Sequence, residues 1–187
     1  PAAEGPSEIN ATPVFYNNRV YIATGQDPEH GEGVGNLVCI DPAGKKGDLT
    51  QSGVVWSYKG AKRSISTVSI DPANGLLFLG DFSGFVHCLD AKTGREQWRE
   101  RIGSNHGASP TFVGGRLLFH SKEGETTVLK PGRKFKILAR NKLDGAHHAS
   151  AARRRASRAA PTAPLNAAGE PGVWFLSLDC DRWPAVR

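Results

Sequence analysis

The segment LLFLGDFSGFVHCLDAKTGREQW, residues 76–98, decides the fold. Its apolar runs are separated by two turns that contain glycine, at residues 81–84 and 90–94, and the segment ends at Trp98. Short apolar runs between turn-forming residues predict antiparallel strands joined by hairpins. The segment is therefore predicted to be three successive strands.

The same order of strands and turns occurs before and after this segment. Upstream it ends at Trp56, which lies 42 residues before Trp98, and downstream aliphatic residues replace the tryptophan. A short stretch of small residues precedes each unit, at residues 11–14, 66–69 and 108–111. A repeat of about 42 residues with four short strands is typical of a β-propeller blade. We predict an all-β fold of about three four-stranded antiparallel blades, at residues 9–60, 61–104 and 105–145.

One stretch of the repeat carries a family resemblance. The run CLDAKTGREQW, residues 88–98, resembles the repeat of PQQ-binding-like, quinoprotein-type β-propellers, in which leucine, aspartate, alanine, threonine and glycine precede a tryptophan. The resemblance covers about residues 9–145 and implies a bacterial, exported protein with the quinoprotein alcohol dehydrogenase-like fold, eight-bladed when intact. It also implies a structural, blade-docking role for Trp56, Trp98, Asp41, Asp90 and Gly94.

Three blades are fewer than the roughly four to eight of known propellers. We therefore expect the chain to be a fragment of a longer propeller, with residues 1–8 continuing from an upstream part. A fourth unit begins on schedule, because Ser150 lies 41 residues after Ser109. The Ala, Arg and Pro composition of residues 152–164 then replaces the expected apolar strand. A frameshift near residues 146–151 is the favoured explanation, and a genuine disordered basic tail over residues 146–187 is the alternative.

Composition excludes several classes of protein. With 39% hydrophobic and 22% charged residues the chain is too apolar for a disordered polymer, and no run approaches the roughly 18 apolar residues of a transmembrane helix. The net charge is +6, and residues 146–187 hold six arginines against three acidic residues. No aromatic side chain interleaves the basic run at residues 153–155, so nucleic-acid binding is not expected.

An acidic insertion is the first place to look for a bound ligand. It contains three carboxylates and an imidazole close together, from Asp27, Glu29, His30 and Glu32. Hard cations prefer oxygen ligands, and the glycines beside them would let the chain wrap around an ion. The spacing differs from that of a calcium loop, so a solvated turn explains the same residues. We treat this segment as a candidate ligand or metal loop and assign no metal site.

The histidines and cysteines give no catalytic pair. His87 and Cys88 are adjacent on a predicted strand and so face opposite ways. Cys39 and Cys88 occupy equivalent repeat positions and are expected to be small buried residues between blades, too far apart for a disulfide. His106 precedes an inner strand, where it would face the central channel or serve a structural role.

Two functional classes follow. The first is a non-catalytic binding or scaffold module in the bacterial cell envelope, periplasmic or otherwise exported. We expect it to have a protein partner, and we leave open a small-molecule ligand and a peripheral association with the envelope. The second is a fragment of a PQQ- and calcium-dependent quinoprotein dehydrogenase that oxidises alcohols or sugars. The family's adjacent cysteines are missing here, and its calcium-holding residues have no assignable match. We therefore favour the scaffold, assign no catalytic residue, and expect PQQ and calcium only in the intact parent.

Overall fold

The structure is a computed structural model that describes residues 9–25, 35–142 and 150. All of these lie in Pro1–Ser150, the first of two units into which the chain divides. The candidate loop with Asp27, Glu29, His30 and Glu32 falls outside the described residues, as does the chain after Ser150. The sequence predictions for both segments therefore stay predictions.

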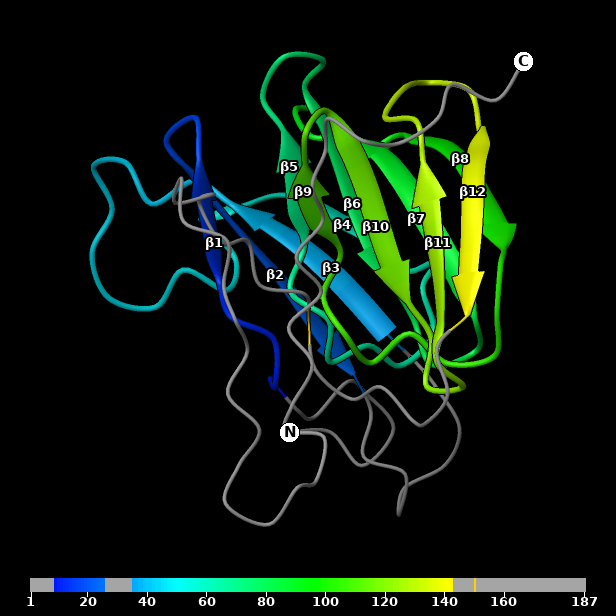
Figure 1. The fold of residues 1–187 in the computed structure, drawn as a ribbon. Coiled ribbons are helices and arrows are strands. Elements are labelled where there is room, and N and C mark those ends of the chain that lie inside the picture. Colours follow the sequence, from blue (N-terminus) through cyan, green and yellow to red (C-terminus); the bar gives the residue numbers. More distant parts are fainter. Residues whose placement is uncertain (1–8, 26–34, 143–149, 151–187) are drawn as a thin grey trace, which may run out of the picture. The chain divides into compact units, whose positions relative to one another are not determined.

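The described residues form three four-stranded antiparallel sheets that follow one another along the chain (Figure 1). Each sheet is a simple meander, which we name blade A, B or C. Blade A contains β1 (Val14–Tyr16), β2 (Arg19–Gly25), β3 (Gly35–Ile40) and β4 (Val54–Tyr58). Blade B contains β5 (Ser69–Asp71), β6 (Leu76–Gly80), β7 (Phe85–Asp90) and β8 (Glu96–Arg101). Blade C contains β9 (Thr111–Val113), β10 (Arg116–His120), β11 (Glu125–Leu129) and β12 (Ile137–Lys142). The predicted all-β propeller fold is confirmed.

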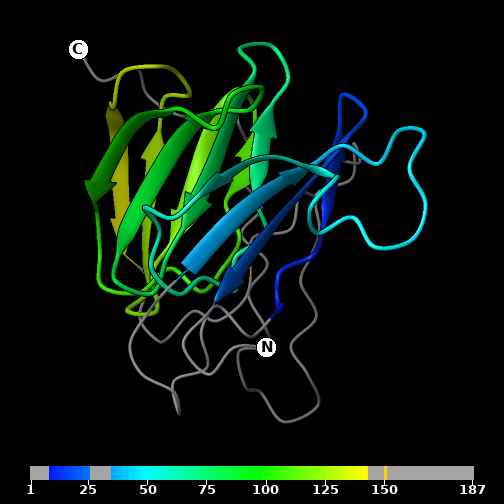
Figure 2. The same ribbon diagram turned by 180° about the vertical axis from the view of Figure 1, so that it is seen from behind.

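Blade B lies between the other two blades and shares a hydrophobic core with each (Figure 2). On one side, Leu77 and Leu79 pack with Tyr21 and Leu37 of blade A. On the other side, Phe78 packs with residues of blade C. Because neighbouring side chains of a strand point to opposite faces, a strand covered on both faces must be apolar throughout. This explains why all five residues of β6 are buried and why its sequence, LLFLG, does not alternate.

The same irregularity recurs in the outer hairpin of each blade. The pairing register shifts between Cys39 and Ile40, between Cys88 and Leu89, and between Val128 and Leu129. Such a β-bulge puts one extra residue on the outer strand and increases its twist. The register also aligns the repeats, because Trp56 pairs with Cys39, Trp98 with Cys88, and Ala139 with Val128. The residue that replaces the repeat tryptophan in blade C is therefore Ala139.

A ladder of hydroxyl groups links the inner ends of successive blades. The backbone N–H of Thr12 donates to Oγ1 of Thr67 (3.0 Å), and the N–H of Thr67 donates to Oγ of Ser109 (2.9 Å). The N–H of Ser109 in turn donates to Oγ of Ser150 (2.8 Å). Ser150 thus accepts the bond that the opening of a next blade would accept. The 41-residue spacing from Ser109 has a direct structural counterpart.

Candidate functional site

Trp56 fixes the seam between blades A and B. Its indole Nε1 donates to the carbonyl oxygen of Ala91 (3.3 Å), in the turn between β7 and β8. A Cβ atom on Gly94 would lie 2.5 Å from the Trp56 ring, and Gly94 has a φ of +71°, so glycine is required there twice over. Asp90 shapes this turn by accepting the N–H groups of Lys92 and Thr93 (both 3.1 Å). The turn of blade B is therefore a socket for the tryptophan of blade A.

The seam between blades B and C repeats this arrangement. Nε1 of Trp98 donates to the carbonyl oxygen of Gly132 (2.9 Å), and the Trp98 and Phe135 ring centroids are 5.2 Å apart. Arg133 of blade C donates to the free carboxylate oxygen of Asp90 (3.0 Å). Burial raises the pKa of Asp90, but hydrogen bonds from Arg133 and Thr93 together outweigh that effect and leave the pKa below its usual value.

In blade A, Asp41 stabilises its turn as Asp90 does in blade B, by accepting a backbone N–H. Its Oδ1 accepts the N–H of Ala43 (2.9 Å), just as Asp90 accepts the N–H of Lys92. The N–H of Asp41 closes the hairpin on Gly53 (2.8 Å), and the N–H of Asp90 closes the shorter turn on Arg95 (2.9 Å). A local carboxylate-to-backbone turn of this kind is a strong preference of aspartate. Asp41 thus organises its own loop.

A chain of polar groups, buried at Asp81 and His87, crosses the seam between blades A and B. Asp81 Oδ2 lies 2.9 Å from His87 Nε2, and His87 Nδ1 lies 3.1 Å from the hydroxyl of Tyr58. Tyr58 also donates to the carboxylate of Glu96. His87 and Asp81 are completely buried. Sequence reasoning compared His87 only with its neighbour Cys88 and missed this chain, because Tyr58 belongs to a different blade.

This set of polar groups resembles a catalytic base that orients a hydroxyl, but its protons are already held in internal hydrogen bonds. Burial raises the pKa of Asp81, yet hydrogen bonds from His87 and from the Lys62 and Phe85 backbone bring it below its usual value. The pKa of Tyr58 is raised by burial and by Glu96. A tyrosine has one proton, and Glu96 accepts it, so Tyr58 is not an activated nucleophile. The chain serves as a polar tie between two blades.

The two described cysteines are equally unreactive. Cys39 and Cys88 are both buried and unpaired, as the sequence predicted. Burial raises the pKa of Cys88 to about 12 and also raises that of Cys39. Since the thiolate is the nucleophile and the metal ligand, both side chains act as small apolar groups at ordinary pH.

His106 is a structural residue of the seam between blades B and C. It is 1% exposed, its Nδ1 lies 3.1 Å from the carbonyl oxygen of His120, and its ring packs edge-on against Phe119. Burial lowers its pKa, and its Nε2 has no partner among the described residues. Nothing in the described ranges brings three or more His, Cys, Asp or Glu side chains together as a metal would need. The described residues alone therefore form no calcium site of several carboxylate oxygens.

Comparison with known proteins places this fold. A family model, PQQ_2, described as outer membrane protein assembly factor BamB, matches residues 48–162 and so extends past Ser150. No curated protein matches the chain. The crystal structure of BamB from Moraxella catarrhalis is similar, with a TM-score of 0.56 and 18% identity over 75% of this chain and 37% of that one. A europium-containing methanol dehydrogenase has a TM-score of 0.55 and 15% identity over 75% of this chain and 26% of that one.

The chain therefore spans well under half the length of either similar structure, and these likenesses show the fold alone. No helix among the described residues has the length and apolar character to cross a membrane. The family match carries more weight, because it covers over half of the chain and begins ahead of the outer strand of blade A. Its match and the three repeated blades together show that the chain belongs to the PQQ_2 family of β-propeller repeat proteins, the family described as outer membrane protein assembly factor BamB.

Proposed function

We propose that the chain is part of a non-catalytic propeller that binds or scaffolds protein partners in the bacterial cell envelope, in the periplasm or another exported location. One observation carries the proposal: Asp81 and His87, the described groups best suited to chemistry, are completely buried in a seam, and the half-buried Tyr58 is hydrogen-bonded to His87. Buried groups that hold blades together have no access to substrate. The family description, which names an outer membrane assembly factor, supports a role in protein assembly.

A stack of blades suits such a role physically. Each blade contacts only its neighbours, so the seams give a rigid frame while the turns and outer strands remain available to partners. The seam contacts of Trp56 and Trp98 provide this rigidity. Function then resides on the surface and not in a closed pocket.

The test is capture of partners from a bacterial envelope extract. The full chain is immobilised, the extract is added, contacts are fixed with a short cross-linker, and bound proteins are identified by mass spectrometry. We expect enrichment of outer-membrane assembly components over an unrelated bait of the same net charge. Equal recovery on both baits would contradict the scaffold role.

The second candidate, part of a PQQ- and calcium-dependent quinoprotein dehydrogenase, rests on the likeness of the fold to methanol dehydrogenase. Its test uses the intact parent protein with added PQQ and calcium. Quinone absorbance retained through gel filtration, together with dye reduction by alcohols or sugars, would overturn the scaffold proposal. We expect neither, since the described residues offer no cradle for the pair.

A further inference from the structure

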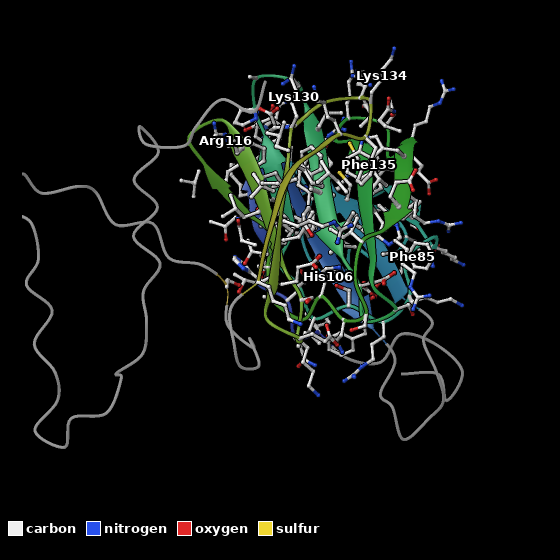
Figure 3. The ribbon with its side chains drawn as sticks, turned by 45° about the vertical axis from the view of Figure 1, so that its right-hand side comes forward. Phe85, His106, Arg116, Lys130, Lys134 and Phe135 are labelled. Carbon is white, nitrogen blue, oxygen red and sulfur yellow. The ribbon has the colours of Figure 1, made fainter. Side chains whose placement is uncertain are left out.

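One end of blade C carries a row of positive charges across three strands. Leu117 pairs with Leu129, so the antiparallel register puts Arg116 of β10 opposite Lys130 at the end of β11. The N–H of Lys130 donates to the carbonyl oxygen of Lys136 (3.0 Å), which places Lys136 on the other side of Lys130. Figure 3 shows Arg116, Lys130 and Lys134 at the same end of the blade. We name Arg116, Lys130, Lys134 and Lys136 the cationic end.

Blades A and B have a carboxylate at the centre of the equivalent row. Asp90 is opposite Leu76 and closes its turn on Arg95, while Asp41 closes its loop on Gly53. Lys130 takes the place of these aspartates in blade C. An ammonium group cannot accept the backbone N–H bonds that Asp41 and Asp90 accept, so the substitution reverses the charge and removes a turn-stabilising contact.

Among the described residues, the lysines of the cationic end pair with no carboxylate, and Arg133 occupies Asp90, the carboxylate beside the same turn. Within the described ranges, no hydrogen bond or ion pair joins the side chain of Lys130, Lys134 or Lys136 to another residue, and all three are exposed. Residues 105–142 contain eight Lys and Arg against two acidic residues. Both acidic residues, Glu123 and Glu125, belong to the β10–β11 turn and the start of β11, at the opposite end of the blade. Like charges held opposite one another on neighbouring strands destabilise a sheet.

A set of residues that destabilises its own sheet and makes no compensating contact there is typical of a binding surface. Adjacent strands are about 4.8 Å apart, so a row across three strands extends about 10 Å, the length of about three residues of extended peptide. Three of the four cations are lysines, which act as flexible point charges and not as the fixed forks that clamp a single phosphate. Phe135, the aromatic residue of the loop, packs on Trp98 and does not project as an anchor for a lipid bilayer.

From these observations we infer that the cationic end of blade C binds an acidic, extended segment of a partner protein. The inference rests on the proposed scaffold function and names the surface and the chemistry of one partner. Charge complementarity supplies the attraction, and the row of cations sets the direction of the segment across the strands. The contact is exposed and therefore weakens as salt rises.

The test measures binding of a fluorescein-labelled oligoglutamate peptide to the full chain by fluorescence anisotropy. The test variant is Lys130→Asp with Lys134→Ser, and the matched control is Lys45→Asp with Lys46→Ser, the same change at two exposed lysines of the blade A loop. We expect the test variant to bind about tenfold more weakly and the control to change by no more than about twofold. Raising the salt from about 0.01 M to 0.15 M should weaken wild-type binding, because the Debye length falls from about 30 Å to 8 Å.

Three results would overturn the inference. One is an equal loss of peptide binding in both variants, which would mean attraction to net charge alone. Another is no peptide binding by the wild type. The third is flotation with phosphatidylglycerol vesicles that depends on Lys130 and Lys134 while the peptide does not bind, which would assign the surface to a membrane. If the peptide does not bind but envelope partners are still captured, the inference about the cationic end is wrong and the scaffold function stands. If the peptide binds but no envelope partner is captured, the scaffold function alone is contradicted.

Discussion

At the scale of single residues, Gly94 shows how closely the seams pack. We expect Gly94→Ala to cost about 2–4 kcal/mol of unfolding free energy, since the new Cβ meets the Trp56 ring at a positive φ. Gly75→Ala is the control, because Gly75 has a similar φ of +63° but no atom within 4 Å of the point that a Cβ would occupy. It should cost only about 1–2 kcal/mol. Equal losses in urea unfolding would show that the backbone, and not the tryptophan, decides the effect.

Asp81 gives the protein a predictable response to acid. Its folded-state pKa lies below the usual value, so the charged carboxylate stabilises the fold above about pH 4, and this contribution is lost as pH falls through the folded-state pKa. Asp81→Asn should cost about 1–3 kcal/mol at pH 7 and should make the urea midpoint less dependent on pH below about 4. The exposed change Glu100→Gln is the control. An unchanged acid slope in Asp81→Asn would contradict this role.

At the residue scale, the sequence identifies a motif most readily where the motif is local. The turn between Asp90 and Gly94 lies within five consecutive residues, and the sequence singled out both of its ends. The tie between Tyr58 and His87 joins residues 29 positions apart on two blades. Its geometry depends on how far one blade is displaced along the next, which no local pattern records.

At the scale of strands, the outer edge of blade A differs from the others. The edge strand β4 reads VVWSY, with Val54 and Val55 42% and 40% exposed, whereas β8 and β12 contain several charges. Uncharged apolar edges invite pairing with other chains. We expect Val55→Lys to reduce concentration-dependent association in analytical ultracentrifugation. The control is Gln97→Lys, at the equivalent bulge of β8, which should leave association unchanged. If Val55→Lys also leaves association unchanged, β4 is not the edge that pairs.

The spacing of the repeat predicted the number and order of blades because four strands and three turns recur at an almost constant interval. It did not predict which residue of blade C replaces the tryptophan. Residues 130–136 separate the paired Leu129 and Ile137 in blade C, one residue more than residues 90–95 between the paired Leu89 and Glu96 in blade B, so only the observed pairing of Ala139 with Val128 settles the alignment. Insertions in turns shift sequence positions without shifting the bulge.

At the scale of the whole stack, the hydroxyl ladder is expected to stabilise the seams between successive blades. Ser109→Ala removes the acceptor of the Thr67 N–H at the seam between blades B and C. We expect a loss of about 1–3 kcal/mol and faster amide exchange at Thr67. Ser83→Ala is the control, because Ser83 is exposed and only its backbone N–H bonds to Asp81. It should change stability by less than about 0.5 kcal/mol, and an equal effect would show that the ladder contributes nothing.

The tryptophan contacts run in one direction only, from the indole of an earlier blade to a carbonyl of the next. In terms of assembly symmetry such a contact is heterologous: repeated, it either closes into a ring or continues into an open filament. Blade C carries Ala139 where an indole would continue the series. Two copies that met head to tail through blade C would therefore lack the anchor that joins blades within one copy. The loss of a single aromatic side chain makes the repeat interface poor at extending itself between molecules.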